Sequence, residues 1–202
     1  MKLPILSSVI VFILVLTHTI KRSNRTTERL KREYLERERK ANFVRRKPLD
    51  NLDYITIPLD TLPMDELVSE KEVAECIETI KELSVEKIVN FTGLSNTDLK
   101  LEYGTANIDI LTTYDSRYTL LVRTLQTWGR LLFDAEKFDA AKSVLEFAVS
   151  TKTDVKGTYE LLIQIYNKQK TPEKIQNLLT IANELNSAMK DPIVRILQAA
   201  CQ

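Results

Sequence analysis

Residues 118–154 read YTLLVRTLQTWGRLLFDAEKFDAAKSVLEFAVSTKTD, and residues 155–189 read VKGTYELLIQIYNKQKTPEKIQNLLTIANELNSAM. A shift of 34 residues places apolar or small side chains of one stretch on those of the other: Trp128 on Leu162, Leu132 on Tyr166, Leu145 on Leu179 and Ala148 on Ala182. This period is typical of helix-turn-helix solenoids, in which each helical pair buries its apolar side against the next. The repeat predicts an all-α fold for residues 118–202.

The first copy, about residues 122–155, resembles a tetratricopeptide repeat. Gly129 falls at the small position of the first helix, and Phe138 falls at the aromatic position that opens the second. Ala141 and Ala148 fall at small packing positions of that second helix. The second copy, about residues 156–189, keeps Tyr166 and Ala182 but has Ile163 and Ile175 where small residues are expected. The last helix, PIVRILQAAC, is expected either to cap the array or to be the first half of an unfinished third repeat.

The resemblance implies a groove, lined by the first helix of each pair, that binds a peptide or protein segment. The expected groove residues are Arg123, Gln126, Arg130, Phe133, Glu160, Gln164, Asn167 and Lys168. Among them, Arg123, Arg130 and Lys168 have the chemistry to hold an acidic peptide through charge-assisted hydrogen bonds. The alternative is that these side chains are ordinary solvated positions. The pattern departs from the carboxylate clamp of chaperone-binding repeats, so binding of chaperone tails is not expected.

Three helix starts are predicted from capping residues. Ser69 followed by Glu72 forms a capping box, and the helix that it opens would bury Val73, Cys76, Ile77 and Ile80. Thr171-Pro172 and Asp191-Pro192 each place a capping side chain before a first-turn proline. Residues 49–68, which contain prolines and which we call the strap, are expected to be extended. Residues 69–117 are expected to be helical, with turns at Gly93 and Gly104.

The net charge of +1 hides a strong zoning of the chain. Residues 21–48 hold 12 Lys and Arg against 4 Glu, which gives +8, whereas residues 50–86 hold 11 acidic residues against 2 Lys, which gives −9. Residues 26–44 lack Gly and Pro and predict a charged helix supported by pairs such as Glu28/Arg32. This segment could be a stalk, could bind anionic lipid, or could dock onto the acidic segment of the same or a neighbouring chain.

Residues 3–20, LPILSSVIVFILVLTHTI, carry no formal charge and are long enough to predict a transmembrane helix. The alternative is a cleaved signal peptide, but no small-residue cleavage site follows. Because Lys and Arg crowd the C-terminal flank, we expect a single-pass protein of the plasma membrane, with its N-terminus outside and its C-terminal domain cytoplasmic. The expected lipid-facing basic residues are Lys21, Arg22, Arg25 and Arg29. This layout resembles single-pass membrane proteins of clostridial-type bacteria.

Catalytic and metal chemistry find little support in the sequence. His18 is the single histidine, and the two cysteines, Cys76 and Cys201, lack the spacing of a metal or redox site. No phosphate loop, dinucleotide fingerprint or zinc-protease motif occurs, so no catalytic residues, no cofactor and no metal are expected. The basic segment lacks stacking aromatic residues, so no nucleic-acid partner is expected. The glycosylation sequons at Asn24 and Asn90 are expected to be chance matches.

The sequence thus predicts an all-α protein with a transmembrane helix (residues 3–20), a basic juxtamembrane helix (21–48), the strap (49–68), a helical segment (69–117) and tetratricopeptide-like repeats (118–202). The expected function is a membrane-anchored scaffold or adaptor that binds a protein or peptide partner. One alternative is a self-associating structural membrane protein, a homo-oligomer. The other is a membrane-tethered enzyme with a carboxylate-lined site.

Overall fold

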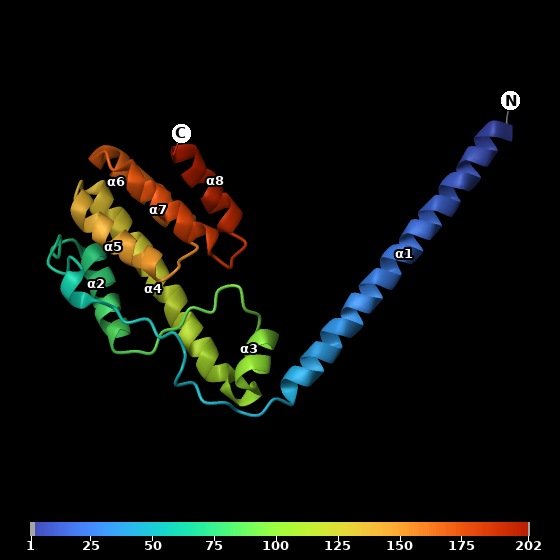
Figure 1. The fold of residues 1–202 in the computed structure, drawn as a ribbon, viewed down its shortest axis with the longest axis horizontal. Coiled ribbons are helices and arrows are strands. Elements are labelled where there is room, and N and C mark those ends of the chain that lie inside the picture. The colour runs from blue at the N-terminus through green and yellow to red at the C-terminus, as the bar shows by residue number, and fades with distance from the viewer. Residues whose placement is uncertain (1–2, 202) are drawn as a thin grey trace. The chain divides into compact units, whose positions relative to one another are not determined.

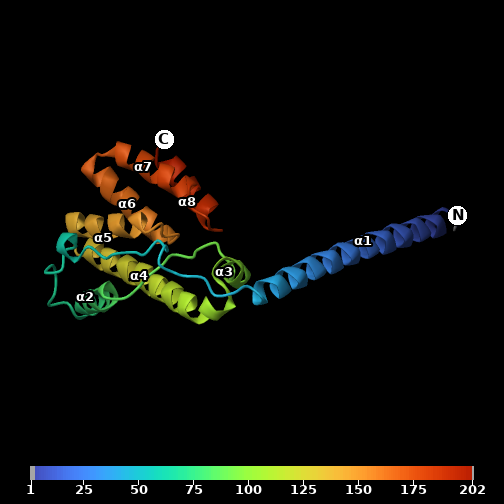
Figure 2. The same cartoon turned by 60° about the horizontal axis from the view of Figure 1, so that its bottom comes forward.

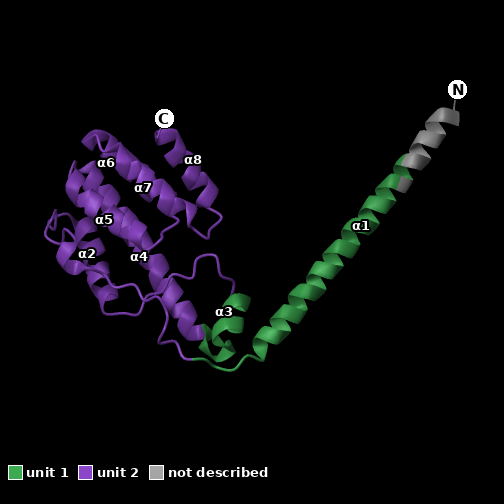
Figure 3. Ribbon diagram, viewed as in Figure 1, with its two compact units in different colours: residues 1–47, 96–108 green, residues 48–95, 109–202 purple. Residues whose placement is uncertain are grey.

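The computed structural model describes residues 3–201, apart from the side chains of residues 3–11 and 14. All regular elements in this range are helices, which fits the all-α class (Figure 1). One isolated antiparallel β-bridge pairs Tyr54 with Val89. The chain divides into two compact units (Figure 3). Unit 1 consists of residues 1–47 and 96–108, and unit 2 of residues 48–95 and 109–202.

The N-terminal region forms a single helix, α1 (Leu3–Asn42), where the sequence predicted two separate segments. No Gly or Pro interrupts the chain between Ile5 and Lys47, so the helix passes without a break from the apolar into the charged stretch. Two exposed ion pairs run along it, Arg29 with Glu33 at 3.5 Å and Arg32 with Glu28 at 3.7 Å.

The prediction of a membrane anchor is corrected by the structure. Within the described residues, no helix combines the length and the apolar character needed to cross a membrane. From Lys21 onward α1 is rich in Lys and Arg, which are costly in hydrocarbon. Part of the predicted anchor, the side chains of residues 3–11 and 14, lies outside the described residues. The transmembrane helix, the single-pass topology and the plasma-membrane location were therefore wrong predictions.

Unit 1 is held together by the end of α1 and by α3 (Asn96–Tyr103) with the short 3-10 helix η2 (Thr105–Asn107). Glu38 accepts hydrogen bonds from the Thr97 hydroxyl and from the Lys100 ammonium. Arg37 pairs with Asp98, so the Glu33/Arg37 pairing that the i,i+4 spacing suggests is replaced by a contact with α3. A methyl group on Gly104, whose φ is +88°, would lie 2.3 Å from the Arg45 carbonyl oxygen in the loop that follows α1, so this close turn requires glycine.

Unit 2 contains the repeat region. Its helices are α2 (Lys71–Ser84), α4 (Ile108–Asp134), α5 (Phe138–Ser150), α6 (Lys156–Gln169), α7 (Pro172–Asn183) and α8 (Lys190–Ala200). Figure 2 shows α4 to α8 following one another as successive helical hairpins. Helix α5 packs against α6, and α6 packs against both α7 and α8. The small position at Gly129 brings α4 close to α5, because a methyl group there would lie 2.5 Å from Leu145 Cδ2.

The core of unit 2 is a continuous apolar cluster that includes residues from every one of these helices. Its largest members with essentially no exposed surface are Trp128, Tyr159, Ile80, Ile88, Leu121, Leu125, Leu132, Leu145, Leu162, Ile165 and Ile175. The apolar positions predicted for α2, Val73, Cys76, Ile77 and Ile80, are all buried. Three hairpin turns use a non-glycine residue in the left-handed region, namely Glu136, Lys152 and Lys170.

Two predicted helix starts are wrong. Helix α2 begins at Lys71, and its N-cap is Glu70, without a side-chain capping bond, so Ser69 and Glu72 form no capping box. Helix α8 begins at Lys190, one residue before the predicted capping residue Asp191. Thr171 does precede α7, with Pro172 in the first turn, but its hydroxyl makes no capping bond. Local sequence identified the helices better than it identified their ends.

The strap is irregular and contains one turn of 3-10 helix, η1 (Leu59–Thr61). Two of its apolar side chains, Ile57 and Leu62, are buried in the core of unit 2. The bridge between Tyr54 and Val89 and the hydrogen bond from the Ile55 N–H to the Ile88 carbonyl (2.9 Å) tie the strap to the loop that follows α2. The strap therefore contributes to packing and is fixed at its centre.

Candidate functional site

Helix α4 has an exposed side that carries two of the predicted groove residues. Arg123 and Arg130 are exposed, whereas Leu125, Trp128 and Leu132 on the opposite side are fully buried. An open groove of about 420 Å³, which we call the α2–α4 groove, runs beside Arg123. It is lined by Glu72, Glu75, Cys76 and Thr79 of α2 and by Arg123, Thr124 and Thr127 of α4.

The α2–α4 groove has walls of opposite charge. On the α2 side, Glu72 and Glu75 are exposed, and Glu75 forms an exposed ion pair of 3.7 Å with Lys71. On the α4 side, Arg123 lines the groove, and Arg130 lies beyond the groove on the same exposed side of the helix. Neither arginine forms an ion pair or a hydrogen bond with any residue that the structure describes. The two arginines are seven residues apart, which is two helical turns or about 10.5 Å along the axis. Two guanidinium groups are thus available to a ligand.

Three of the other predicted groove residues are engaged inside the fold. Gln126 accepts a hydrogen bond of 2.7 Å from the Thr158 hydroxyl and thereby joins α4 to α6. Phe133 makes an edge-to-face contact with Phe138, with ring centroids 5.3 Å apart. The Lys168 ammonium lies 4.5 Å from the centre of the same Phe138 ring, which is a cation–π contact. The side chain of Lys168, a residue of α6, therefore lies against the start of α5 and does not line the α2–α4 groove.

The remaining groove candidates lie on α6. Glu160 is half-buried and forms an ion pair of 2.7 Å with Lys156 one turn earlier. Gln164 and Asn167 are exposed, and their side chains make no hydrogen bond with a described residue. The structure therefore brings Arg123 and Arg130 together on α4, while the α6 candidates and the aromatic pair form other parts of the surface.

The predicted lipid-facing residues lie on α1 in unit 1. Lys21, Arg22 and Arg25 line a shallow hollow of about 500 Å³ together with His18 and Thr26. Arg29 is engaged in the ion pair with Glu33. Their expected role against lipid depended on the membrane anchor, so the correction of the anchor removes its basis.

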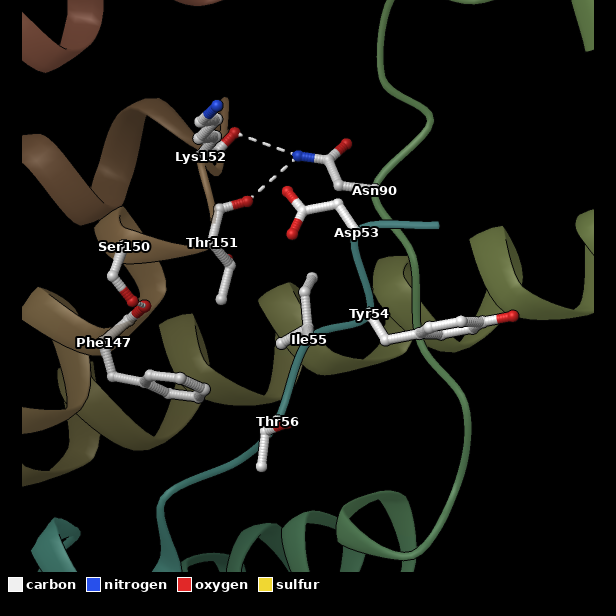
Figure 4. Close-up of a pocket in the computed structure, with 9 residues that line it drawn as sticks. All are labelled: Asp53, Tyr54, Ile55, Thr56, Asn90, Phe147, Ser150, Thr151 and Lys152. Atoms are coloured by element: carbon white, nitrogen blue, oxygen red, sulfur yellow. Dashed lines mark hydrogen bonds between the residues drawn. The ribbon is translucent and has the colours of Figure 1, made fainter. Parts of the chain in front are cut away.

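Asn90 forms a set of tertiary hydrogen bonds that sequence analysis did not predict. The Asn90 amide nitrogen donates to the Tyr118 hydroxyl at 2.9 Å and to the Thr151 carbonyl at 3.0 Å, and its oxygen accepts from the Thr92 N–H at 2.8 Å. It borders a pocket of about 320 Å³ that also has Asp53, Ile55 and residues of the end of α5 in its wall (Figure 4). No local pattern links position 90 to position 151, because the contact depends on the tertiary fold.

Metal and thiol chemistry are not suggested by the geometry. In residues 3–201, as far as their side chains are described, no group of three or more His, Cys, Asp or Glu could hold a metal ion. Both cysteines are free, Cys76 buried and Cys201 exposed. Burial raises the pKa of the Cys76 thiol, which disfavours the reactive thiolate.

No family model, no curated protein and no solved structure matches this chain. The resemblance to tetratricopeptide repeats, and that to clostridial-type membrane proteins, therefore stay predictions. The same holds for the alternatives of a self-associating protein and of a carboxylate-based enzyme.

Proposed function

We propose that this chain is a helical protein-binding scaffold whose α2–α4 groove, together with Arg130 beyond it on α4, receives an extended acidic segment of a partner protein. The observation that carries the proposal is the pair of arginines, Arg123 and Arg130, exposed on one side of α4 without partners among the described residues. Guanidinium groups favour carboxylates because they offer several N–H donors in a planar fork.

The spacing of the arginines constrains the ligand. They stand about 10.5 Å apart along α4, and a polyproline II segment brings residues i and i+3 onto one face about 9.3 Å apart. Two acidic residues three apart in an extended peptide would thus reach both guanidinium groups. A residue between the two acidic residues of the peptide would then face the opposite wall of the groove, which carries Glu72 and Glu75. A basic residue is expected at that position, because its charge complements the two glutamates. The expected motif is Glu-Lys-Pro-Glu or its chemical equivalents.

The proposal can be tested by fluorescence anisotropy on the full chain with labelled peptides. The set contains Ser-Glu-Lys-Pro-Glu-Ser, its Gln-for-Glu analogue, and analogues in which the two Glu are two, four or five residues apart. We expect the tightest binding at a spacing of three and a loss of affinity as salt is raised. If each arginine contributes about 1 kcal/mol, R123Q/R130Q lowers the affinity about 30-fold.

The matched control is K170Q/R195Q, which removes the same charge from the exposed C-cap residue of α6 and from an exposed position of α8. Its affinity should stay within about twofold of the unchanged chain, because screening weakens charges beyond roughly 10 Å. Equal binding of the Gln analogue, or an equal loss in the control, would show that the arginines do not form a site. The proposal would then be wrong.

A further inference from the structure

The pocket beside Asn90 is separate from the α2–α4 groove and shares no residue with it. Figure 4 shows that its wall is built by strap residues 53–56, by Asn90 and by the end of α5 with the turn that follows. Its volume of about 320 Å³ is at the lower end of the range for small-molecule sites. A pocket of this size accommodates one side chain or one small organic molecule.

The walls of this pocket are fixed by hydrogen bonds. The Ile55 N–H donates to the Ile88 carbonyl at 2.9 Å, and the adjacent bridge joins Tyr54 to Val89. On the other side, the Asn90 amide holds the Thr151 carbonyl. Because the side-chain amide of Asn90 is already hydrogen-bonded within the fold, Asn90 stabilises the wall of the pocket and is not expected to bind a ligand.

One charged group remains available inside the pocket. The Asp53 carboxylate points from the strap toward the Thr151 side of the pocket, whereas the Lys152 side chain leads away from it (Figure 4). Asp53 forms no ion pair or hydrogen bond with any residue that the structure describes. The pocket also lies at the C-terminal end of α5, where the helix dipole adds partial negative charge. Both features favour a cation.

Two residues give part of the wall an apolar surface. Ile55 and Phe147 are half-buried and face the same space as the Asp53 carboxylate (Figure 4). An apolar surface next to a carboxylate suits an alkyl chain that ends in a positive group. It does not suit a bare divalent cation, because Ca²⁺ or Mg²⁺ needs about six oxygen ligands and the pocket offers one carboxylate.

We infer that this pocket binds a guanidinium or ammonium group carried on an alkyl chain, with the cation at Asp53 and the chain between Ile55 and Phe147. The same chemistry occurs in a free alkyl cation and in an Arg or Lys side chain of a partner protein. The inference does not depend on the α2–α4 groove.

The experiment is a two-dimensional ¹H–¹⁵N NMR titration of the full chain with n-butylguanidinium, and with the neutral isostere n-butylurea. We expect saturable shifts of the amide signals of Asp53, Thr56 and Thr151 with the cation and none with the urea. Methylguanidinium should bind several-fold more weakly, since it lacks the alkyl chain. Equal shifts with the urea would overturn the inference.

Two variants assign the binding to Asp53. D53N should lower the affinity for n-butylguanidinium about tenfold, which corresponds to about 1.4 kcal/mol. D60N removes the same charge from another exposed residue of the strap and should leave the affinity unchanged. Unchanged binding by D53N, or an equal loss in D60N, contradicts the assignment. Because Asp53 is exposed and forms no ion pair or hydrogen bond with a described residue, both variants should retain the stability of the unchanged chain.

A last arm separates the two sources of the cation. The peptide acetyl-Gly-Arg-Gly-amide is titrated beside n-butylguanidinium. Tighter binding of the peptide identifies the ligand as a side chain of a partner protein, because the peptide backbone then adds contacts. Tighter binding of n-butylguanidinium identifies a free alkyl cation. Absence of saturable shifts with both probes would refute the inference.

Discussion

Replacing Gly129 by alanine tests how closely α4 and α5 approach. The new methyl group would lie 2.5 Å from Leu145 Cδ2 and 2.7 Å from Leu145 Cγ, whereas carbon atoms in contact are normally about 3.5 to 4.0 Å apart. Leu145 has no exposed surface, so it has no room to swing aside, and the two helices must separate instead. Such overpacking costs about 1 to 3 kcal/mol, and the gain in helix propensity returns about 1 kcal/mol.

We therefore expect Gly129→Ala to lower the free energy of unfolding by up to about 2 kcal/mol. Gly157→Ala is the matched control, because the methyl group there would meet only the end of the flexible Gln126 side chain, at 2.8 Å. It should stay within about 0.5 kcal/mol of the unchanged chain, since helix propensity offsets the small shift. Urea unfolding followed by circular dichroism measures both changes.

A double-mutant cycle with Leu145→Ala assigns the cost to this contact. Alone, Leu145→Ala removes a buried side chain and should cost about 2 to 5 kcal/mol. Together with Gly129→Ala, the total loss should be at least about 1 kcal/mol smaller than the sum, because the clash disappears and the methyl group fills part of the cavity. Additive losses, or a Gly129→Ala chain as stable as Gly157→Ala, would refute the close approach.

Three further predictions concern other contacts. Gly93→Ala should cost about 2 to 4 kcal/mol in urea unfolding, because φ is +85° and a methyl group would lie 2.1 Å from the Asn186 carbonyl. Burial raises the pKa of Tyr118 to about 12, so its contribution to stability is complete below about pH 10 and is lost as the pH rises toward 12; Tyr118→Phe should lose less stability across that range. The bond from Lys100 lowers the pKa of Glu38, so the contact between α1 and α3 should weaken as the pH falls through that lowered pKa, and amide exchange of α3 should show no such acid step in Glu38→Gln.

Hydrophobic periodicity predicted most of the helices in unit 2 and the buried face of α2. This succeeded because burial of an apolar stripe is a local property that 3.6-residue spacing reveals. The helix starts at residues 69 and 191 failed, since a capping side chain is a preference that competes with tertiary packing. The membrane anchor also failed, because the prediction assigned a function to the apolar composition of residues 3–20, while the structure has one helix from Leu3 to Asn42.

The predicted groove shows a different limit of sequence reasoning. A helical repeat indicates which side of a helix is polar, and Arg123 and Arg130 are indeed exposed. It does not indicate which polar side chain a neighbouring helix uses, so Gln126 was taken as a groove residue although it bonds to Thr158. The role of Asn90 depends on contacts with Thr151 and was beyond any local pattern.

The left-handed residues in the hairpin turns bear on the order of folding. Glu136, Lys152 and Lys170 have φ near +60°, a conformation that costs a non-glycine residue about 1 kcal/mol. Each turn is therefore locally unfavourable and is stabilised only after the helices on both sides pack. The turns should form late, with φ-values near zero in a kinetic analysis, while contacts between the helices form the folding nucleus. Glycine at any of the three positions should then slow unfolding more than it speeds folding.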